Sequence, residues 1–190
     1  MFRSLLSRAS GRTVALAMSV ACALVLHSPA AAQGCTPAAS PPAGPLCGTT
    51  DTAYVGSDTV LVPVFWGIPY GSAGRWQAPA ASAVWTTSLQ ATQPGSICPQ
   101  FLADAATNQY SIIGGSEDCL YLNVWQPPDA SPDSTLPVMV FIHGGTFYAG
   151  AGSLGAYDGA YLAASGNVVV VTLNYRLGAL GWLATDTLQA

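Results

Sequence analysis

Positive charge is nearly absent from this sequence. It contains no lysine, and its five arginines stand against nine acidic residues in a chain of 190 positions, of which only 7% are charged. Because phosphates are bound mainly by cationic side chains, nucleic acids and anionic membrane surfaces make poor partners for such a chain. Its hydrophobic content of 51% argues against disorder, so we expect one globular domain whose better-suited ligand is a neutral small molecule.

The sequence also lacks an apolar run near its start that is long enough to cross a membrane. Val14–Leu26 spans about 13 residues, against the roughly 20 that a bilayer requires. Three arginines precede this run, and the small residues Ala30–Ala32 follow it as a cleavage site before Gln33. This arrangement predicts a secretory signal peptide over residues 1–32, with a membrane anchor as the alternative. We therefore expect the chain to be secreted or periplasmic.

Cysteines are few, and their number after signal cleavage is even. Cys22 lies inside the predicted signal peptide, and the others are Cys35, Cys47, Cys98 and Cys119. In an oxidising compartment this set predicts two disulfides. Proximity favours Cys35 with Cys47 and Cys98 with Cys119, among three possible connectivities. A zinc site is disfavoured because no second histidine or close cysteine pair accompanies them. Lipid attachment at Cys22 or Cys35 lacks a convincing acylation box, and no metal or cofactor is expected.

The first part of the exported chain shows no regular pattern. Residues 33–57 are rich in proline, alanine, glycine and threonine, which predicts an irregular leader closed by the first disulfide. Beyond it, β-branched and aromatic residues predict a strand over 59–66, and alternation predicts another over 120–125. A long irregular stretch with the second disulfide separates these two strands.

The pattern changes in the last third of the chain. Two continuous apolar runs, 136–142 and 167–173, are typical of strands buried on both faces. Residues 157–164 between them have the length and alanine content of a short helix. A strand, helix, strand unit implies a parallel pair of strands with a right-handed crossover, and hence an α/β sheet rather than a β-sandwich.

A glycine pair follows the first of these strands. Val138–Ile142 leads directly into His143, Gly144 and Gly145. A buried strand that ends in such a turn can aim backbone N–H groups at a developing negative oxygen, and glycine lets the backbone approach closely. The pattern is that of an oxyanion hole.

Four segments stand out when they are taken together and in order. They are Trp66–Tyr70 with Gly74–Trp76, Glu117–Trp125, His143–Phe147 and Asn174–Gly178. They resemble the G-I-P-Y and R-F, E-D-C-L-Y-L-N, oxyanion-loop and N-Y-R-x-G segments of one known family, with Trp76 where phenylalanine is more usual. The family is that of the type-B carboxylesterases, the α/β-hydrolases that include the cholinesterases and many bacterial esterases.

This resemblance implies a fold and two internal links. Residues 58–190 resemble the N-terminal portion of an α/β-hydrolase, in which antiparallel strands lead into a mostly parallel sheet that is here incomplete. Family members pair the signature cysteine with an upstream one, which agrees with a Cys98–Cys119 disulfide. They also pair Arg75 with Glu117. Signal cleavage leaves two arginines against nine acids, a net charge of −7, and both arginines fall on family positions.

The resemblance also assigns roles within the oxyanion loop. The family pattern makes the backbone N–H groups of Gly145 and Thr146 the donors, with His143 and Gly144 supporting the loop. Thr146 replaces a frequent third glycine, which leaves its N–H unaffected unless the site requires a positive φ, a conformation that β-branched residues resist. We expect His143 to pack and hydrogen-bond beside the loop rather than to transfer protons.

The residues that complete an esterase site are missing. Such a site needs a serine on a strand-to-helix elbow, an acid and a histidine, yet no G-x-S-x-G occurs and His143 is the only histidine after the signal. Ser153 in Ala151–Gly155 is the closest imitation, but it follows a loop instead of a strand. We therefore expect the N-terminal portion of a longer protein, inactive by itself. The edge of Val138–Ile142, which the nucleophile strand would cover, should lie open.

Three functions remain open from the sequence. The first is a secreted carboxylic-ester hydrolase that acts on a small-molecule ester; the others are a non-catalytic cholinesterase-like adhesion or interaction protein, and an unstable truncated product. Phe147 and Tyr148 adjoin the loop and are candidates for lining a pocket, whereas core packing is favoured for Trp66 and Trp76. No nucleic-acid partner, and no membrane after signal cleavage, is expected, and no oligomeric state is predicted.

Overall fold

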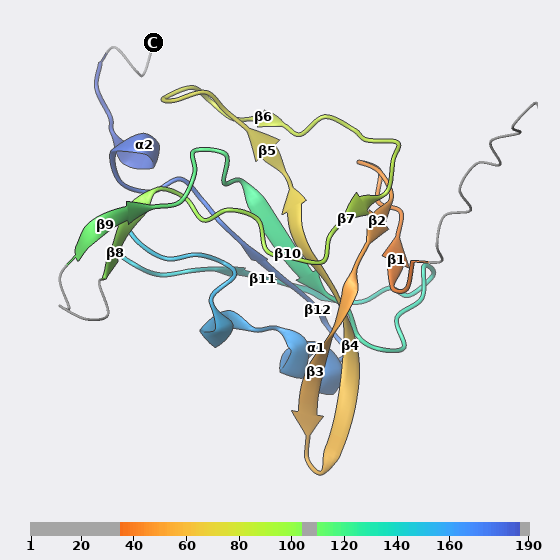
Figure 1. Ribbon diagram of the computed structural model, residues 1–190. Helices are drawn as coiled ribbons and strands as arrows, with labels where there is room; N and C mark the ends of the chain where they lie inside the picture. The colour runs from red at the N-terminus through yellow and green to blue at the C-terminus, as the bar shows by residue number, and fades with distance from the viewer. Residues whose placement is uncertain (1–34, 104–109, 187–190) are drawn as a thin grey trace, which may run out of the picture. The chain divides into compact units, whose positions relative to one another are not determined.

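The computed structural model describes residues 35–103 and 110–186 (Figure 1). The chain divides into two units, residues 1–33 and 34–190, and all described residues belong to the second. The signal peptide predicted over residues 1–32 lies outside them. Within the described part, no helix combines the length and the apolar character that crossing a membrane requires.

A five-stranded sheet forms the centre of the described unit. Its order is β11-β12-β10-β4-β3, in which β11 and β12 are parallel and every other neighbouring pair is antiparallel. Antiparallel strands thus lead into one parallel pair at the far edge, as expected for the start of an α/β-hydrolase sheet. The strands are β3 (Thr49–Val55), β4 (Asp58–Pro69), β10 (Tyr121–Trp125), β11 (Val138–Ile142) and β12 (Val169–Leu173).

The smaller elements surround this sheet. Two short helices and a 3₁₀ turn occur in the described residues: η1 (Gly155–Tyr157), α1 (Ala160–Gly166) and α2 (Gly178–Trp182). Short strands form three minor sheets, in the orders β1-β2-β7, β5-β6 and β8-β9. Their bounds are β1 (Ala38–Ala39), β2 (Leu46–Cys47), β5 (Gly71–Ser72), β6 (Ala80–Ala81), β7 (Leu89–Gln90), β8 (Gln100–Ala103) and β9 (Tyr110–Gly114).

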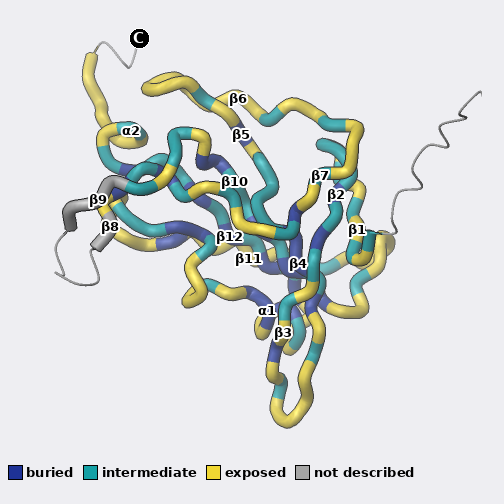
Figure 2. The backbone as a smooth tube through the Cα atoms, viewed as in Figure 1, coloured by how far each residue is buried: buried dark blue, intermediate teal, exposed yellow. Residues whose placement is uncertain are grey.

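The main core lies between the sheet and α1. Small residues of α1, Ala160 and Ala163, allow the helix to approach the face of β3 and β4, where Val62 and Val64 are fully buried (Figures 1 and 2). Trp125 of β10 completes this cluster and meets Trp66 edge to face, with ring centroids 4.8 Å apart. Since successive side chains of a strand point to opposite faces, Phe65 packs on the other face with Leu46 and Ala91.

Asn123 joins three strands through its side chain. Its Oδ1 accepts the backbone N–H of Gly67 at 3.0 Å, where β4 turns through a glycine with φ of 64°, and its Nδ2 donates to Thr172 Oγ1 at 3.0 Å. The register of β4 against β10 shifts beside it, between Leu122 and Val124. Because both polar atoms of this buried amide are satisfied, Asn123 links β4, β10 and β12 at little desolvation cost.

Three expectations need correction or adjustment. The leader is not irregular throughout, because Thr49–Val55 is strand β3, which pairs along its full length with β4 across a two-residue turn at Gly56 and Ser57. The burial of its residues alternates along the chain, as in a strand packed on one face, but its threonine-rich composition shows no alternation of polar and apolar residues. The predicted helix begins later than expected: η1 covers 155–157, and α1 begins at Ala160.

The third correction concerns β11. A continuous apolar run predicted burial on both faces, yet all five residues of Val138–Ile142 are exposed, by 42% to 66%. The reason is that β12 covers one edge of the strand, while the described residues supply little to cover its faces beyond the contact of Phe141 with Tyr157. The open edge that the sequence predicted is therefore present in the described structure.

Candidate functional site

The chain turns sharply where β11 ends. After His143, three successive residues have positive φ: Gly145 at 114°, Thr146 at 52° and Phe147 at 65°. Gly145 is required at its position, since a Cβ atom there would lie 1.9 Å from the carbonyl oxygen of Ala149. The backbone N–H of Ala149 closes the turn by donating to the carbonyl of Gly145 at 3.1 Å. Thr146 thus adopts the left-handed conformation that β-branched residues resist.

Two backbone N–H groups of this turn, those of Gly145 and Thr146, make no hydrogen bond within the described residues. Among the described residues, no acceptor lies within hydrogen-bonding distance of the N–H groups of Gly145 and Thr146, and both residues are exposed. Gly144 has open space where a Cβ would be. The turn therefore offers unpaired N–H donors on an accessible surface, an arrangement able to bind an anionic oxygen.

His143 is buried beneath this turn. Its Nδ1 lies 2.8 Å from the carbonyl oxygen of Gly144, and because a carbonyl only accepts, Nδ1 carries a proton in this contact. Nε2 is buried without a partner among the described residues. The ring stacks on Tyr175 with centroids 4.3 Å apart, and the Tyr175 hydroxyl donates to the His143 carbonyl at 2.9 Å. These contacts hold the loop.

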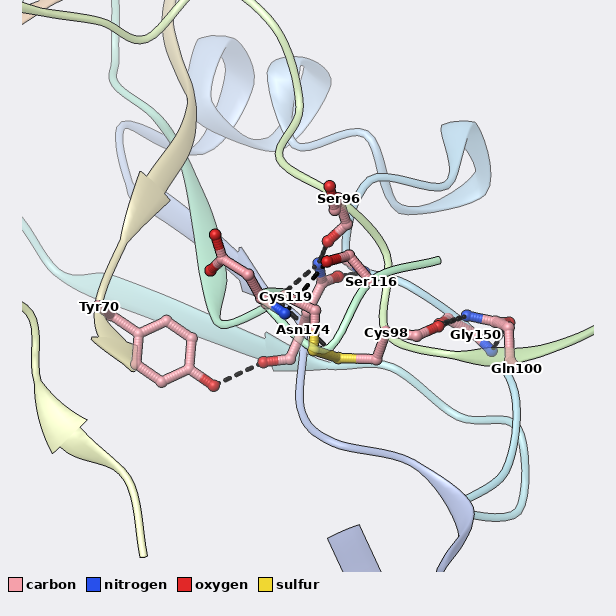
Figure 3. Close-up of a disulfide and its surroundings, with 10 residues drawn as sticks. Tyr70, Ser96, Cys98, Gln100, Ser116, Cys119, Gly150 and Asn174 are labelled. Carbon is pink, nitrogen blue, oxygen red and sulfur yellow. Dashed lines mark hydrogen bonds between the residues drawn. A yellow bond between two sulfur atoms is a disulfide. The ribbon is translucent and has the colours of Figure 1, made fainter. Parts of the chain in front are cut away.

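The segment that returns from the turn is fixed by two amide side chains. Gln100 receives the N–H of Gly150 at 2.8 Å and donates to its carbonyl at 2.9 Å (Figure 3). Asn174 accepts the N–H of Gly152 at 2.9 Å and donates to the carbonyls of Ser96 and Cys119. Gln100 also donates to the carbonyl of Cys98, so each amide bonds the backbone of one cysteine of the Cys98–Cys119 disulfide, and the returning segment is anchored beside that bridge.

The other side of the turn contacts α2. The N–H of Gly178 donates to the carbonyl of Phe147 at 2.8 Å, and the ring of Phe147 lies 4.3 Å from that of Trp182. Phe147 and Tyr148 remain more than half exposed. A cavity of about 730 Å³ lies elsewhere, between the leader and the sheet face of Phe65.

Both predicted disulfides are confirmed. Cys35 is bonded to Cys47, and Cys98 to Cys119. Cys98 and Cys119 are both buried in a small cluster with Leu120 and Leu177. Of these residues, Leu177 belongs to the N-Y-R-L-G segment. No group of three metal-ligating side chains occurs within the described ranges.

Arg75 and Glu117 lie side by side, joined by bonds from the guanidinium to both carboxylate oxygens. Arg75 Nε is 3.0 Å from Oε1 and 3.1 Å from Oε2 of Glu117. These hydrogen bonds hold the pKa of Glu117 below its ordinary value. The guanidinium also lies over the ring of Trp76, 5.9 Å from its centroid. Both side chains of the pair are exposed, so the pair orients this segment more than it stabilises the fold.

Ser153 has none of the surroundings of a nucleophile. It is half-buried in the segment between the turn and η1, and the described residues supply no hydrogen bond to its hydroxyl. His143, the one histidine in the described part, makes its Nδ1 contact with the Gly144 carbonyl. The structure therefore brings Gly144, Gly145, Thr146 and His143 together without a catalytic serine.

Sequence reasoning missed three residues of this region. Gln100, Gly150 and Tyr175 hold the turn, yet none received a role from the sequence. For Tyr175, its place beside Asn174 in the N-Y-R segment was a usable signal. Gln100 contacts a glycine 50 positions away, and no local pattern reveals such a contact.

Comparison with known proteins places this turn in a family. The family model described as "Carboxylesterase family" matches residues 37–190. The chain is 52% identical over 121 residues to para-nitrobenzyl esterase of Bacillus subtilis, covering 62% of this chain and 24% of the relative. It is 42% identical over 141 residues to acetylcholinesterase of Danio rerio, covering 68% and 22%. It is 38% identical over 169 residues to neuroligin-2 of Mus musculus, covering 68% and 20%.

Solved structures agree. A thermophilic PNB esterase superimposes with a TM-score of 0.61 at 40% identity, covering 79% of this chain and 30% of that one. The chain spans about a quarter of the length of the curated relatives it matches. With the α/β-hydrolase strand order, the family's disulfide and the glycine turn after β11, the match over residues 37–190 shows that this chain belongs to the carboxylesterase family.

Proposed function

We propose that this chain supplies the oxyanion hole of a secreted serine carboxylesterase. The observation that carries the proposal is the turn after β11, where the N–H groups of Gly145 and Thr146 are exposed and lack acceptors within the described residues. Such donors stabilise the negative oxygen that forms when an acyl carbonyl is attacked, and each contributes roughly 3 kcal/mol to the transition state.

In the proposed reaction, a serine hydroxyl attacks the carbonyl carbon of a small-molecule ester while a histidine takes its proton. The carbonyl π electrons move to oxygen, which the two N–H groups bind. Collapse of this intermediate expels the alcohol, which receives the proton, and water then releases the acid by the same steps. In this proposal the turn after β11 contributes the oxyanion donors, and other residues of the whole protein provide the serine, the acid and the histidine.

The threonine at position 146 is compatible with this role. Its N–H belongs to the main chain, and the turn already holds the residue at φ of 52°. The contacts at the neighbouring residues, from Tyr175 to His143 and from Gly178 to Phe147, support this conformation. The donor that the family pattern assigns to a glycine is thus retained, at a cost in backbone strain.

Two further features support export as part of this proposal. The arrangement of arginines, apolar run and small residues over 1–32 fits a signal peptide cleaved before Gln33. The two disulfides, Cys35–Cys47 and Cys98–Cys119, are typical of an oxidising compartment. We place the protein outside the cytoplasm, in the periplasm or the medium. In this scheme the N-terminal portion of the catalytic domain includes strand β3 (Thr49–Val55) as well as residues 58–190.

Two measurements test the proposal. The purified 190-residue chain should not hydrolyse a simple chromogenic ester, whereas a longer product of the same reading frame should carry a G-x-S-x-G and hydrolyse it. Ser153→Ala is the matched control, because Ala151–Gly155 around this serine is the segment identified from the sequence as the closest imitation of the motif. Turnover by the 190-residue chain that survives Ser153→Ala would contradict the proposed division of residues, and a longer homologous frame without the motif would contradict the esterase itself.

A non-catalytic interaction protein is the second candidate. It is favoured by the identity of 38% over 169 residues to neuroligin-2, a relative whose name states no hydrolytic activity. The same downstream serine discriminates the two, since a non-catalytic member has no need of it. An unstable product is distinguished from both by circular dichroism and light scattering of the purified chain, which would show an unfolded or aggregated state.

A further inference from the structure

One side chain outside the turn controls the position of the segment that returns from it. Gln100 is 8% exposed, and both polar atoms of its amide are hydrogen-bonded. Nε2 donates to Gly150 O at 2.9 Å and to Cys98 O at 3.1 Å, and Oε1 accepts the Gly150 N–H at 2.8 Å. A buried amide that bonds both the N–H and the carbonyl of one glycine restrains the two peptide groups on either side of that residue.

Gly150 in turn lies against the start of the turn. It has φ of 115°, and a Cβ atom built on it would be 2.4 Å from His143 Nδ1 and 2.6 Å from the carbonyl oxygen of Gly144. The backbone of Gly150 therefore forms the surface on which the His143 ring and the Gly144 peptide rest. The next two N–H groups along the chain are those of Gly145 and Thr146.

Gln100 is itself held firmly. It is two residues from Cys98, whose disulfide to Cys119 is buried, and its own Nε2 bonds the Cys98 carbonyl (Figure 3). A contact path of bonded and touching groups thus runs from the disulfide through Gln100 and Gly150 to His143 and Gly144.

We propose that Gln100 is a positioning residue of the oxyanion loop: through Gly150 it sets where the N–H groups of Gly145 and Thr146 point. Its consequence for hydrolysis rests on the function proposed above. The geometric part of the inference does not, because the position of these N–H groups can be measured in the chain without any turnover.

The sharpest variant is Gln100→Glu, which keeps the shape of the side chain. At neutral pH its carboxylate still accepts the Gly150 N–H but has no proton to donate to the carbonyls of Gly150 and Cys98. These two carbonyl oxygens then lose their donor and lie against a carboxylate oxygen. Protonation of the carboxyl group restores one donor. The effect of Gln100→Glu should therefore be reversed as the pH falls, whereas general damage to the fold would not be.

The primary measurement is the ¹H–¹⁵N spectrum of the full 190-residue chain. Gln100→Glu should move the amide resonances of Gly145, Thr146 and Gly150 at pH 7.5, and these should return toward wild-type positions at acidic pH. Gln90→Glu is the matched control: it places the same charge on exposed strand β7 and should leave those resonances in place. Movement of Gly150 alone, with Gly145 and Thr146 unchanged at every pH, would overturn the proposal.

A second variant covers the case in which Gln100→Glu does not fold. Gln100→Asn keeps a neutral amide but shortens the side chain by one methylene, so it loses reach to Gly150 while introducing no charge. It should move the same three resonances, without a pH dependence. Wild-type positions for Gly145 and Thr146 in Gln100→Asn would equally overturn the proposal.

Activity separates this inference from the proposed function. In a longer product that hydrolyses esters, Gln100→Glu should lower kcat about tenfold at pH 8 with KM within about twofold, since a displaced oxyanion donor acts on the transition state. If the wild-type longer product hydrolyses no ester, the proposed function fails, and the spectra still decide whether Gln100 positions the loop. An unchanged kcat in an active enzyme would show that Gln100 does not position the donors for catalysis.

Discussion

The two edges of the main sheet differ in how well the described residues cover them. At one edge, β3 has small or polar residues at alternate positions, and its inner face packs on α1 through Ala53. At the other edge, all five residues of β11 are apolar and exposed on both faces. One face of β3 is thus packed against α1, whereas both faces of β11 are exposed. Since the glycine turn follows β11, the candidate site lies at the exposed edge of the sheet.

This difference also divides the supports of the turn. The strand that enters it is held along one edge by β12 alone, whereas the segment that leaves it is anchored by Gln100, Asn174 and the Cys98–Cys119 disulfide. The returning segment can thus hold its geometry from within these residues. The entering strand needs a cover that the described residues do not supply.

The largest expected effect compares one substitution at two places in the same sheet. Val64→Ala removes fully buried methyl groups and should lower the free energy of unfolding by about 2 kcal/mol, from lost burial plus the cavity left behind. Val140→Ala acts on a side chain that is 58% exposed and should cost less than about 0.5 kcal/mol. Urea denaturation followed by tryptophan fluorescence measures both.

Equal costs for these two valines would contradict the comparison. They would mean that β11 is covered in solution, and sedimentation velocity on the same samples would show whether a second copy of the chain provides the cover. A smaller loss of stability in Val64→Ala than in Val140→Ala would show that β11, and not β4, is the better-buried strand.

The next effect concerns association through the open edge. An apolar edge strand with unpaired backbone groups pairs readily with other chains, and a lysine within it opposes such pairing. Val140→Lys should raise the concentration at which the chain associates about tenfold, which corresponds to about 1.4 kcal/mol. Tyr54→Lys places the same charge on β3, where Tyr54 is 72% exposed, and should change association little. Light scattering across a concentration series compares them.

Association reduced equally by Tyr54→Lys and Val140→Lys would show that net charge, not the β11 edge, controls it. Association reduced by Tyr54→Lys alone would assign the sticky edge to β3 and reverse the comparison.

Sequence patterns predicted the parts of this fold that depend on local composition. Strands β4, β10 and β12 have β-branched or alternating residues, and both disulfides join cysteines close in sequence. Burial of β11 could not be predicted in this way, because an apolar run states what a strand needs and not whether a neighbour provides it. Strand β3 was missed because its threonines resemble those of the leader.

The candidate site was predictable only in its covalent outline. The glycine pair after a strand identified the turn, and the family pattern assigned Gly145 and Thr146. The support of the turn was not predictable, because Gln100 and Tyr175 reach it from 50 and 32 residues away through bonds to backbone atoms, which impose no residue type on their partners. A positive φ at Thr146 was the condition under which the sequence predicted strain at this threonine, and Thr146 has a positive φ in the structure.

The third effect relieves that strain. A non-glycine residue in the left-handed region costs roughly 1–2 kcal/mol, and glycine avoids this at an entropic cost of up to about 1 kcal/mol. Thr146→Gly should therefore stabilise the chain by about 0.5–1 kcal/mol. Asn167→Gly is the control, since Asn167 has a similar φ of 49° at the end of α1 but tolerates it, and should change little. Thermal unfolding by circular dichroism ranks the two, and a loss of stability in Thr146→Gly would show that the threonine side chain holds the turn.

The smallest effect lies at the β3 edge of the sheet, where Asp158 precedes α1, the helix that packs on β3. Burial raises the pKa of Asp158, the Ala160 N–H that bonds to it lowers this pKa, and nearby Asp51 raises it. Because the folded-state pKa is raised, this group costs no stability below the ordinary aspartate pKa and lowers stability as the pH rises through the folded value. Asp158→Asn keeps the acceptor for Ala160 and removes the charge. It should stabilise the chain at pH 7 by a few tenths of a kcal/mol, reduced by partial exposure, and the gain should vanish near pH 3.

Asp133→Asn, on an exposed loop, should be neutral at both pH values. A gain for Asp158→Asn that is equal at pH 3 and pH 7 would mean that the charge is not its source, and a loss at pH 7 would mean that the carboxylate stabilises α1 where it meets β3.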